Sequence, residues 1–271
     1  MMLPPLDSSQ TLLMIRLMAS VALLINSTEQ LRNWRDYGDD GLLSWKIARL
    51  QTIARPLRAI APLAEALFSF PSYLGVVVFR ALAAGVLLVP HLPPAAEWTA
   101  LGIVVLTSQL SHYRHIFGQD GSDQLLRMLF IVLLLVSFFP GDEAVGKAGL
   151  WFVALQSTLA YFAAGVMKTF GPAWRNGDAV FLVLNTPTFG MRQAALLLRE
   201  RRPIARVLTW STVAMECLFP LALIAGPRAA LVFLAWGFTF HLANAVLMGL
   251  NSFLFTFVAT YPAILFCAAR G

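Results

Sequence analysis

The residues best suited to chemistry lie in the segment YFAAGVMKTFGPAWRNGDAV, residues 161–180. Tyr161 and Lys168 are seven residues apart in an apolar run, so on a helix they share a face, two turns apart. A lysine enclosed by other helices loses hydration, its pKa falls, and it can act as a general base near neutral pH. A lysine at the end of a membrane span can instead extend its amine to the headgroups, and position alone favours that role. Gly165, which follows two alanines, favours close helix approach.

Five further ionisable residues lie inside apolar runs: Arg16, Arg80, Arg127, Glu216 and His241. On insertion scales a charge at the centre of a span costs about 2.5–3.5 kcal/mol, so each one needs a partner, water or a function. Arg127 lies near the start of its run, where it can serve as an interfacial anchor. Arg16 and Arg80 lie deeper. Two roles stay open for them: a buried pair with a carboxylate such as Glu216, or contact with an anionic ligand.

Three of the four histidines lie close to another polar residue in the sequence, His241 to Asn244 and His112 to His115. His241 and Asn244 are three residues apart, so they face the same direction on a helix. This spacing favours a buried histidine that is hydrogen-bonded to a neighbouring helix. His112 and His115 flank Arg114 at the end of an apolar run, where we expect solvated side chains. We therefore predict no metal site.

The composition shows what kind of chain must position these residues. Of its 271 residues, 58% are hydrophobic and 13% are charged, and the mean hydropathy is +0.71, whereas about a quarter of the residues in a soluble domain are charged. The net charge of +6 is explained by loop Lys and Arg that orient a membrane protein, so we expect no nucleic-acid partner. The N-terminal residues lack the features of a cleaved signal peptide, so the first apolar run predicts a retained span.

The apolar runs are continuous rather than alternating, which favours membrane-spanning helices of roughly twenty residues. We predict an all-α, polytopic integral membrane bundle over 1–271, a single transmembrane domain with no soluble domain. Basic residues interleaved with tryptophan and leucine in 28–71, and the segment MRQAALLLRERR before Pro203, predict interfacial amphipathic helices, the second ended by that proline. The spans, about eight in number, are predicted at 9–27, 72–91, 97–113, 123–140, 147–168, 206–226, 229–249 and 251–269.

Several segments together resemble a known family. AGVMK (164–168) and GPAWRNG (171–177) are similar to a lysine- and tryptophan-containing segment of the vitamin K-dependent γ-carboxylases and of the related bacterial HTTM (horizontally transferred transmembrane) family. HLANAVLMGLNSFLFTFVATYPAILF (241–266) resembles the same family's late His-x-x-Asn helix pair. The resemblance covers nearly the whole chain and also includes RHIFGQDGSDQLLRMLF (114–130), YGDDGLLS (37–44) and Glu216.

The resemblance implies a role for each matching residue. Lys168 matches the base that deprotonates a reduced naphthoquinone, and oxygenation of that quinol yields the strong base used for glutamate carboxylation. Met167 stands where the carboxylases have a second lysine, and their large lumenal domain is absent, so the relatives nearest in size are stand-alone HTTM proteins, including the SdpB-like group. The site expected from the resemblance comprises Lys168, His241 and Glu216 as catalytic residues and Tyr161, Asn244, Trp174 and Arg80 as residues that bind the quinone cofactor.

Several functions therefore stay open. The first is a membrane enzyme, a γ-carboxylase-like lyase or a quinol epoxidase, that acts on a quinol or on a peptide delivered by the membrane. The second is a non-enzymatic factor for the maturation of a peptide toxin, or for immunity to it, as in the SdpB-like group. A small transporter would be expected to show an inverted repeat, which the sequence lacks, and a haem-binding quinol oxidase subunit would need paired axial histidines. In each case we expect a multi-pass protein of a cell membrane, such as the bacterial inner membrane, with the lipid bilayer as its surroundings.

Overall fold

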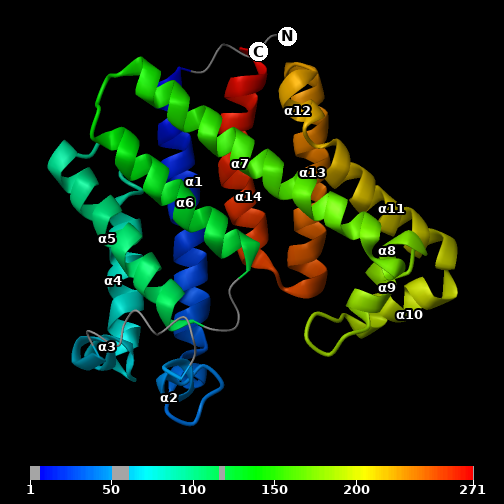
Figure 1. Cartoon of the computed structure of the whole chain (residues 1–271), viewed down its shortest axis with the longest axis horizontal. Helices are drawn as coiled ribbons and strands as arrows, with labels where there is room; N and C mark the ends of the chain where they lie inside the picture. The colour runs from blue at the N-terminus through cyan, green and yellow to red at the C-terminus, as the bar shows by residue number, and fades with distance from the viewer. Residues whose placement is uncertain (1–6, 51–60, 116–119, 271) are drawn as a thin grey trace. The chain divides into compact units, whose positions relative to one another are not determined.

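The computed structural model describes residues 7–50, 61–115 and 120–270. These residues are predominantly helical, and they contain no strand. The chain divides into two compact units. The N-terminal unit is Leu13–Val145, and the C-terminal unit is Gly146 onward together with the residues up to Leu12. Figure 1 labels the helices of both units.

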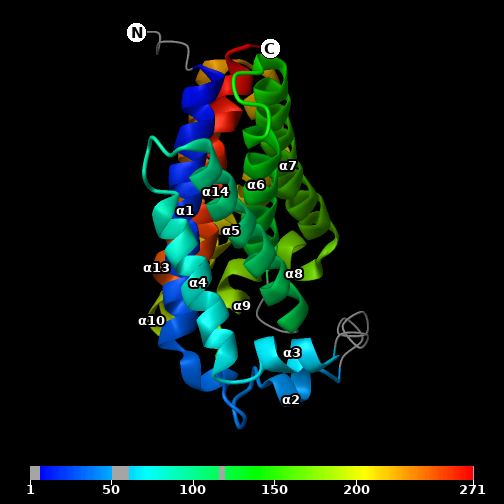
Figure 2. The same cartoon turned by 90° about the vertical axis from the view of Figure 1, so that its left-hand side faces the viewer.

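The N-terminal unit contains most of one long helix, several short elements and three further helices. Its elements are α1 (Ser8–Arg32), η1 (Trp34–Tyr37), α2 (Trp45–Ala48), α3 (Ala61–Phe68), α4 (Ser72–Val86), α5 (Pro94–Arg114) and α6 (Gly121–Ser137). α4 packs along α5, and α5 packs along α6 (Figure 2). The start of α6 is fixed by a capping box, in which the Asp120 side chain accepts from the backbone of Asp123 and the Asp123 side chain accepts from the backbone of Asp120.

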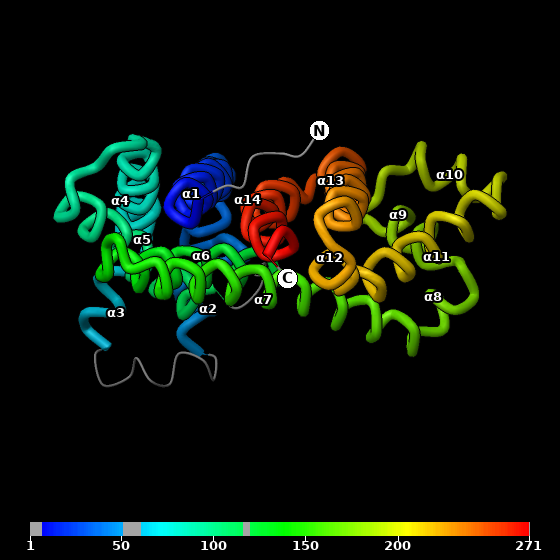
Figure 3. Tube along the Cα trace, turned by 90° about the horizontal axis from the view of Figure 1, so that it is seen from above, coloured from blue at the N-terminus to red at the C-terminus, as the bar shows by residue number. Residues whose placement is uncertain are grey.

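The C-terminal unit begins within the longest helix and ends with a helical hairpin. Its elements are α7 (Glu143–Phe170), α8 (Pro172–Arg175), α9 (Ala179–Leu184), α10 (Arg192–Glu200), α11 (Arg202–Leu218), α12 (Leu221–Ile224), α13 (Pro227–Met248) and α14 (Asn251–Ala268). α13 and α14 lie side by side, and α12 packs against both (Figure 3). Gly249 ends α13 in the left-handed conformation with φ +71°, which glycine adopts without steric cost. The short sequence between the last two predicted spans is therefore a true helix break.

Within the described residues, four helices are long and apolar enough to cross a membrane: α1, α7, α13 and α14. The pair α3 and α4, bent by 72°, raises the number to five if it forms one broken span. Seven of the eight predicted spans each correspond to one helix, and the span 206–226 corresponds to α11 and α12. Those at α4, α5, α6 and α11 are shorter or more polar, so the count of about eight stays a prediction.

Two prolines act differently from the expectation. The predicted amphipathic helix exists as α10, but it ends at Glu200, and Pro203 lies in the first turn of α11. Proline suits that position because the first backbone N–H groups of a helix have no intrahelical acceptor. Pro220 follows the end of α11, so the predicted span 206–226 is divided between α11 and α12.

In its described part, the stretch expected to lie at the membrane interface contains the short helices η1, α2 and α3. Trp45 of α2 donates its indole N–H to Glu65 of α3 at 2.9 Å, and a small core of Tyr37, Trp45, Phe68 and Tyr73 joins these helices to α4. The interfacial placement itself stays a prediction. Arg55 and Arg58, and positions 116–119 of the polar segment 114–130, lie outside the described residues.

Candidate functional site

An ion pair joins the last turn of α7 to α11. The Lys168 amine donates to both carboxylate oxygens of Glu216, at 2.7 Å to Oε1 and 2.6 Å to Oε2. The lysine side chain is 21% exposed and the glutamate side chain is 5% exposed. The amine therefore has a carboxylate partner on a neighbouring helix, and its position relative to the headgroups stays a prediction.

Gly165 is the residue that lets α7 approach α11 closely enough for this pair. A Cβ atom at position 165 would lie 2.7 Å from the backbone nitrogen of Cys217 and 2.8 Å from Cβ of Glu216. Ordinary carbon contacts lie at about 3.5–4.0 Å, so any larger residue would force the helices apart. The close approach expected at Gly165 is confirmed.

Trp174 covers the lysine from the following turn. Gly171 ends α7, and the four-residue helix α8 places the Trp174 ring with its centroid 5.1 Å from the Lys168 amine. A cation at this distance from an indole face is attracted by the negative face of the ring. The amine therefore lies between a carboxylate and an aromatic surface.

A second polar group lies in the same unit, one to two turns nearer the start of α7. The Tyr161 hydroxyl is 2.8 Å from Nε2 of His241 and 3.3 Å from the Tyr261 hydroxyl. Phe219 stacks on Tyr161 with ring centroids 3.8 Å apart, and Phe257 stacks on His241 at 4.4 Å. The hydrogen bonds between helices expected for a buried His241 are confirmed.

His241 retains an unused ring nitrogen. Its Nδ1 is buried and has no hydrogen-bond partner among the described residues, which is uncommon for a buried polar atom. Gly237, one turn earlier on α13, leaves room for the tyrosines, because a Cβ there would lie 2.9 Å from the Tyr261 hydroxyl and 3.1 Å from the Tyr161 hydroxyl. The group is thus tightly packed around one unsatisfied nitrogen.

The structure brings most of the expected site residues into these two groups. Lys168, Glu216 and Trp174 form the first, and Tyr161 and His241 belong to the second. Asn244 is half-buried, one turn beyond His241 on α13. Tyr261 was not expected, although a tyrosine inside the apolar run of α14 was a signal that could have marked it.

Arg80 belongs to the N-terminal unit and has a different environment from the one expected. Its guanidinium donates to the side-chain oxygens of Ser27, Ser111, Asn26 and Gln30, at 3.1–3.3 Å. Glu216 is engaged by Lys168 instead. Of the two roles left open for Arg80, a pair with a carboxylate such as Glu216 is not the one that these contacts show, because its partners here are neutral side chains of its own unit.

Arg16 is a buried pairing residue, with a carboxylate other than Glu216. Its guanidinium donates to Glu97 at 2.6 Å and to the carbonyl oxygens of Val89 and Pro90 at 2.8 Å. Both carbonyls lie in the connection that follows α4, which ends at Val86. This is why an arginine inside an apolar run does not interrupt α1.

The expectation that His115 is solvated is wrong. Arg114 is 1% exposed and donates to the carbonyls of Phe68, Leu43 and Tyr37, and the rings of Tyr37 and Tyr73 lie 5.0 and 4.2 Å from its guanidinium. His115 is buried beside them. These contacts hold the loop 37–44 against the end of α5.

Burial sets the protonation of this cluster. His115 Nδ1 is 2.8 Å from the Ser111 carbonyl, and Nε2 is 3.4 Å from the Tyr37 hydroxyl. Desolvation, and secondarily the charges of Arg114 and Arg80, lower the pKa of His115 to about 4, and burial raises the pKa of Tyr37 above its ordinary value. Both side chains are therefore neutral at pH 7. In this tautomer Nδ1 donates to the carbonyl and Nε2 accepts from the tyrosine.

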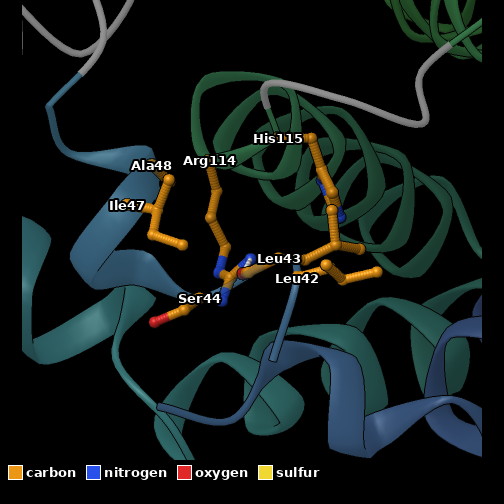
Figure 4. A pocket seen from close by; sticks show the side chains of 7 residues that line it. All are labelled: Leu42, Leu43, Ser44, Ile47, Ala48, Arg114 and His115. Atoms are coloured by element: carbon orange, nitrogen blue, oxygen red, sulfur yellow. Dashed lines mark hydrogen bonds between the residues drawn. The ribbon is translucent and has the colours of Figure 1, made fainter. Parts of the chain in front are cut away.

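A small pocket lies against Arg114 and His115, lined by Leu42, Leu43, Ser44, Ile47 and Ala48 (Figure 4). Its volume of about 10 Å³ is room for about one water molecule. It is too small for a quinone. Among the residues that the structure describes, no group of His, Cys, Asp and Glu could hold a metal ion.

No protein-family model, no curated protein and no solved structure matches this chain. The candidate site therefore depends on its own geometry. That geometry offers one lysine paired with one buried carboxylate, an aromatic surface beside the amine, and a buried Tyr–His–Tyr group contributed by α7, α13 and α14. Such an arrangement is suited to proton transfer.

Proposed function

We propose that this chain is a multi-pass membrane enzyme, of the γ-carboxylase-like and HTTM type, in which Lys168 and Glu216 remove a proton from a lipid-soluble quinol or from a membrane-delivered peptide. The observation that carries the proposal is the bidentate contact between Lys168 and a nearly buried carboxylate. Perturbed or paired ionisable groups inside an apolar bundle are typical of functional sites.

The pair gives a route to a neutral amine. The pair can exist as an ammonium with a carboxylate or as a neutral amine with a neutral acid. In an apolar environment both ions have lost their hydration, so the free energy that favours the charged form is smaller than in water. A proton can then pass from the Lys168 amine to a carboxylate oxygen of Glu216, leaving a free amine and a neutral acid. The free amine accepts the proton of a substrate hydroxyl, and Glu216 holds the first proton until it is released.

The surroundings of Lys168 suit a reduced naphthoquinone. Trp174 provides an aromatic face, and Met167 and Phe170, on either side of Lys168, are 69% and 71% exposed. Exposed apolar residues on a helix fit to span a membrane are expected to face lipid, so a lipid-soluble ring could approach from the side. When bound, such a quinol supplies an acidic hydroxyl and reducing equivalents for oxygen.

The proposal ends at proton transfer and does not extend to glutamate carboxylation. Met167 occupies the position of the carboxylases' second lysine, and its side chain is exposed rather than directed to the pair. The cellular setting that we propose is a bacterial inner membrane. In that membrane, α4, α5, α6 and α11 cross together with α1, α7, α13 and α14.

A non-enzymatic function is the second candidate, as a maturation or immunity factor of the SdpB-like kind. The same short ion pair supports it, because a contact of both oxygens with one amine can serve to lock α7 to α11. In that case Lys168 and Glu216 would be required for folding and not for turnover.

Turnover of a quinol by the protein in lipid nanodiscs tests the proposal. We expect the wild-type protein to consume a reduced naphthoquinone under air faster than nanodiscs alone, as measured by chromatography of the quinol. Glu216→Gln is expected to lower the rate on the order of a hundredfold, whereas Glu143→Gln, at the other end of α7, is expected to leave it unchanged. A wild-type rate equal to that of empty nanodiscs would favour the non-enzymatic function.

A further inference from the structure

The turn between α10 and α11 carries a concentration of positive charge. We call residues 192–208 the α10–α11 corner; α10 lies beside α9 and leads directly into α11 (Figure 1). The corner contains five arginines, Arg192, Arg199, Arg201, Arg202 and Arg206, and one acidic residue, Glu200. All five arginines are exposed.

One face of α10 is held against the protein. Ala195 and Leu198 are buried in a small core with Leu184 of α9 and Ala205 of α11. The helix is therefore a fixed part of the C-terminal unit, and its remaining faces are presented outward at defined positions.

The outward faces combine charge with apolar side chains. Leu196 and Leu197 of α10 are about half exposed, and on α11 Val207 is 68% exposed. Arg202 makes a 3.4 Å contact with Asp178 while its own side chain stays 63% exposed. Within residues 7–50, 61–115 and 120–270, no carboxylate lies at ion-pair distance from the other four arginines.

We propose that the α10–α11 corner binds the phosphate headgroups of anionic phospholipids. Guanidinium groups match phosphate oxygens in geometry and charge. The adjacent leucines and valine would enter the acyl boundary, as in interfacial amphipathic helices. A nucleic acid or a soluble acidic protein would leave these apolar side chains in water. A phospholipid offers a phosphate to the arginines and acyl chains to the apolar side chains. Clusters of cationic side chains beside a span attract the anionic cytoplasmic leaflet.

The test compares the full-length protein in nanodiscs of phosphatidylcholine alone and of phosphatidylcholine with phosphatidylglycerol. The corner variant combines Arg192→Gln, Arg199→Gln and Arg201→Gln. A charge-matched control combines Arg175→Gln, Arg228→Gln and Arg270→Gln, which are exposed arginines outside the corner and outside the stretch 28–71, and a third protein carries lysine at the three corner positions. The readouts are the thermal midpoint and, by native mass spectrometry, the number of phosphatidylglycerol molecules retained.

Phosphatidylglycerol is expected to raise the midpoint of the wild-type protein, the control and the lysine variant, and this shift is expected to decrease as salt increases. The corner variant should match wild type in phosphatidylcholine alone but lose the shift and retain phosphatidylglycerol on the order of tenfold more weakly. An equal shift in the corner variant, or an equal loss in the control, would overturn the proposal. So would a wild-type shift produced by inorganic phosphate without anionic lipid, because that would identify a free anion as the ligand. If the corner variant is unstable in phosphatidylcholine, the lysine variant provides the test. If phosphatidylglycerol did not raise the thermal midpoint of the lysine variant, that result would also contradict a charge-based lipid site.

Discussion

At the scale of single residues, the Lys168 amine is held by two oxygens of one carboxylate, and this determines how the site can handle a proton. A lysine without a partner at this depth would have to lose its charge or reach water. With Glu216 beside it, the same lysine can exist as an ion or as a neutral amine without a change in the net charge of the pair. In the proposed function, one proton moves between these two groups.

His115 gives a prediction for stability against pH. Its pKa is about 4 in the folded protein against 6.5 for an ordinary histidine, so folding favours the neutral ring. This contribution is complete above pH 6.5 and is lost as the pH falls toward 4, by up to about 3 kcal/mol. In detergent, thermal unfolding of the wild-type protein should show this loss between pH 7 and pH 4.5, and His115→Gln should show less of it. The exposed His91→Gln serves as the control; an identical pH dependence in His115→Gln and wild type would contradict this role.

The sequence predicted which residues belong to the site better than it predicted which of them contact each other. Lys168, Trp174, Tyr161 and His241 were recognisable from spacing and from resemblance, and they do lie in two local groups. Burial of Arg114 was not predictable, because its partners are backbone carbonyls of distant segments. Every residue has a backbone carbonyl, so the sequence does not indicate which ones accept a hydrogen bond.

At the scale of elements, the crossing of α7 and α11 at Gly165 positions the ion pair. Gly165→Ala is expected to destabilise the protein by about 1–3 kcal/mol, because a methyl group would meet the backbone of Cys217. Gly102→Ala on α5 is the matched control, since nothing lies within 4 Å of its added carbon. Thermal midpoints in the same detergent compare the two, and equal midpoints would show that α7 does not depend on this glycine.

Helix positions were largely predictable from apolar runs, whereas helix ends were not. Continuous apolar sequence marks a helix whatever its partners, so seven of the eight predicted spans each correspond to one helix, and only 206–226 is divided. The ends depend on local hydrogen bonds: Arg16 satisfies carbonyls after α4, and Asp120 caps α6. The prediction that Pro203 ends the amphipathic helix was wrong in mechanism, because Pro203 lies in the first turn of the next helix, α11.

At the scale of the whole molecule, the number of membrane crossings is the main open prediction. Four helices, or five with the bent pair, are long and apolar enough by themselves. The remaining predicted spans carry buried polar residues, such as Arg80 on α4 and Ser111 on α5, that bond to one another. Polar residues lower the hydropathy of a helix, and their pairing inside a bundle keeps them from lipid, so hydropathy alone does not decide whether α4 and α5 cross.

Cysteine accessibility can count the crossings. In a background without Cys217 and Cys267, an eight-span protein predicts that cysteines at the exposed positions Leu42 and Thr188 react with an impermeant maleimide from one side. Cysteines at the exposed positions His91 and Asp142 should react from the other side. Labelling of Leu42→Cys and His91→Cys from the same side would show that α4 does not cross.

The most direct test of the central claim, that Lys168 is the base, is the rate of naphthoquinol consumption by Lys168→Ala with and without ethylamine. The proposed role predicts a loss on the order of a hundredfold or more in a variant that inserts and folds normally, and partial recovery when ethylamine supplies the missing amine. Lys147→Ala, a lysine at the start of the same helix, should retain the wild-type rate. A folded Lys168→Ala protein that consumes the quinol at the full wild-type rate would contradict the claim.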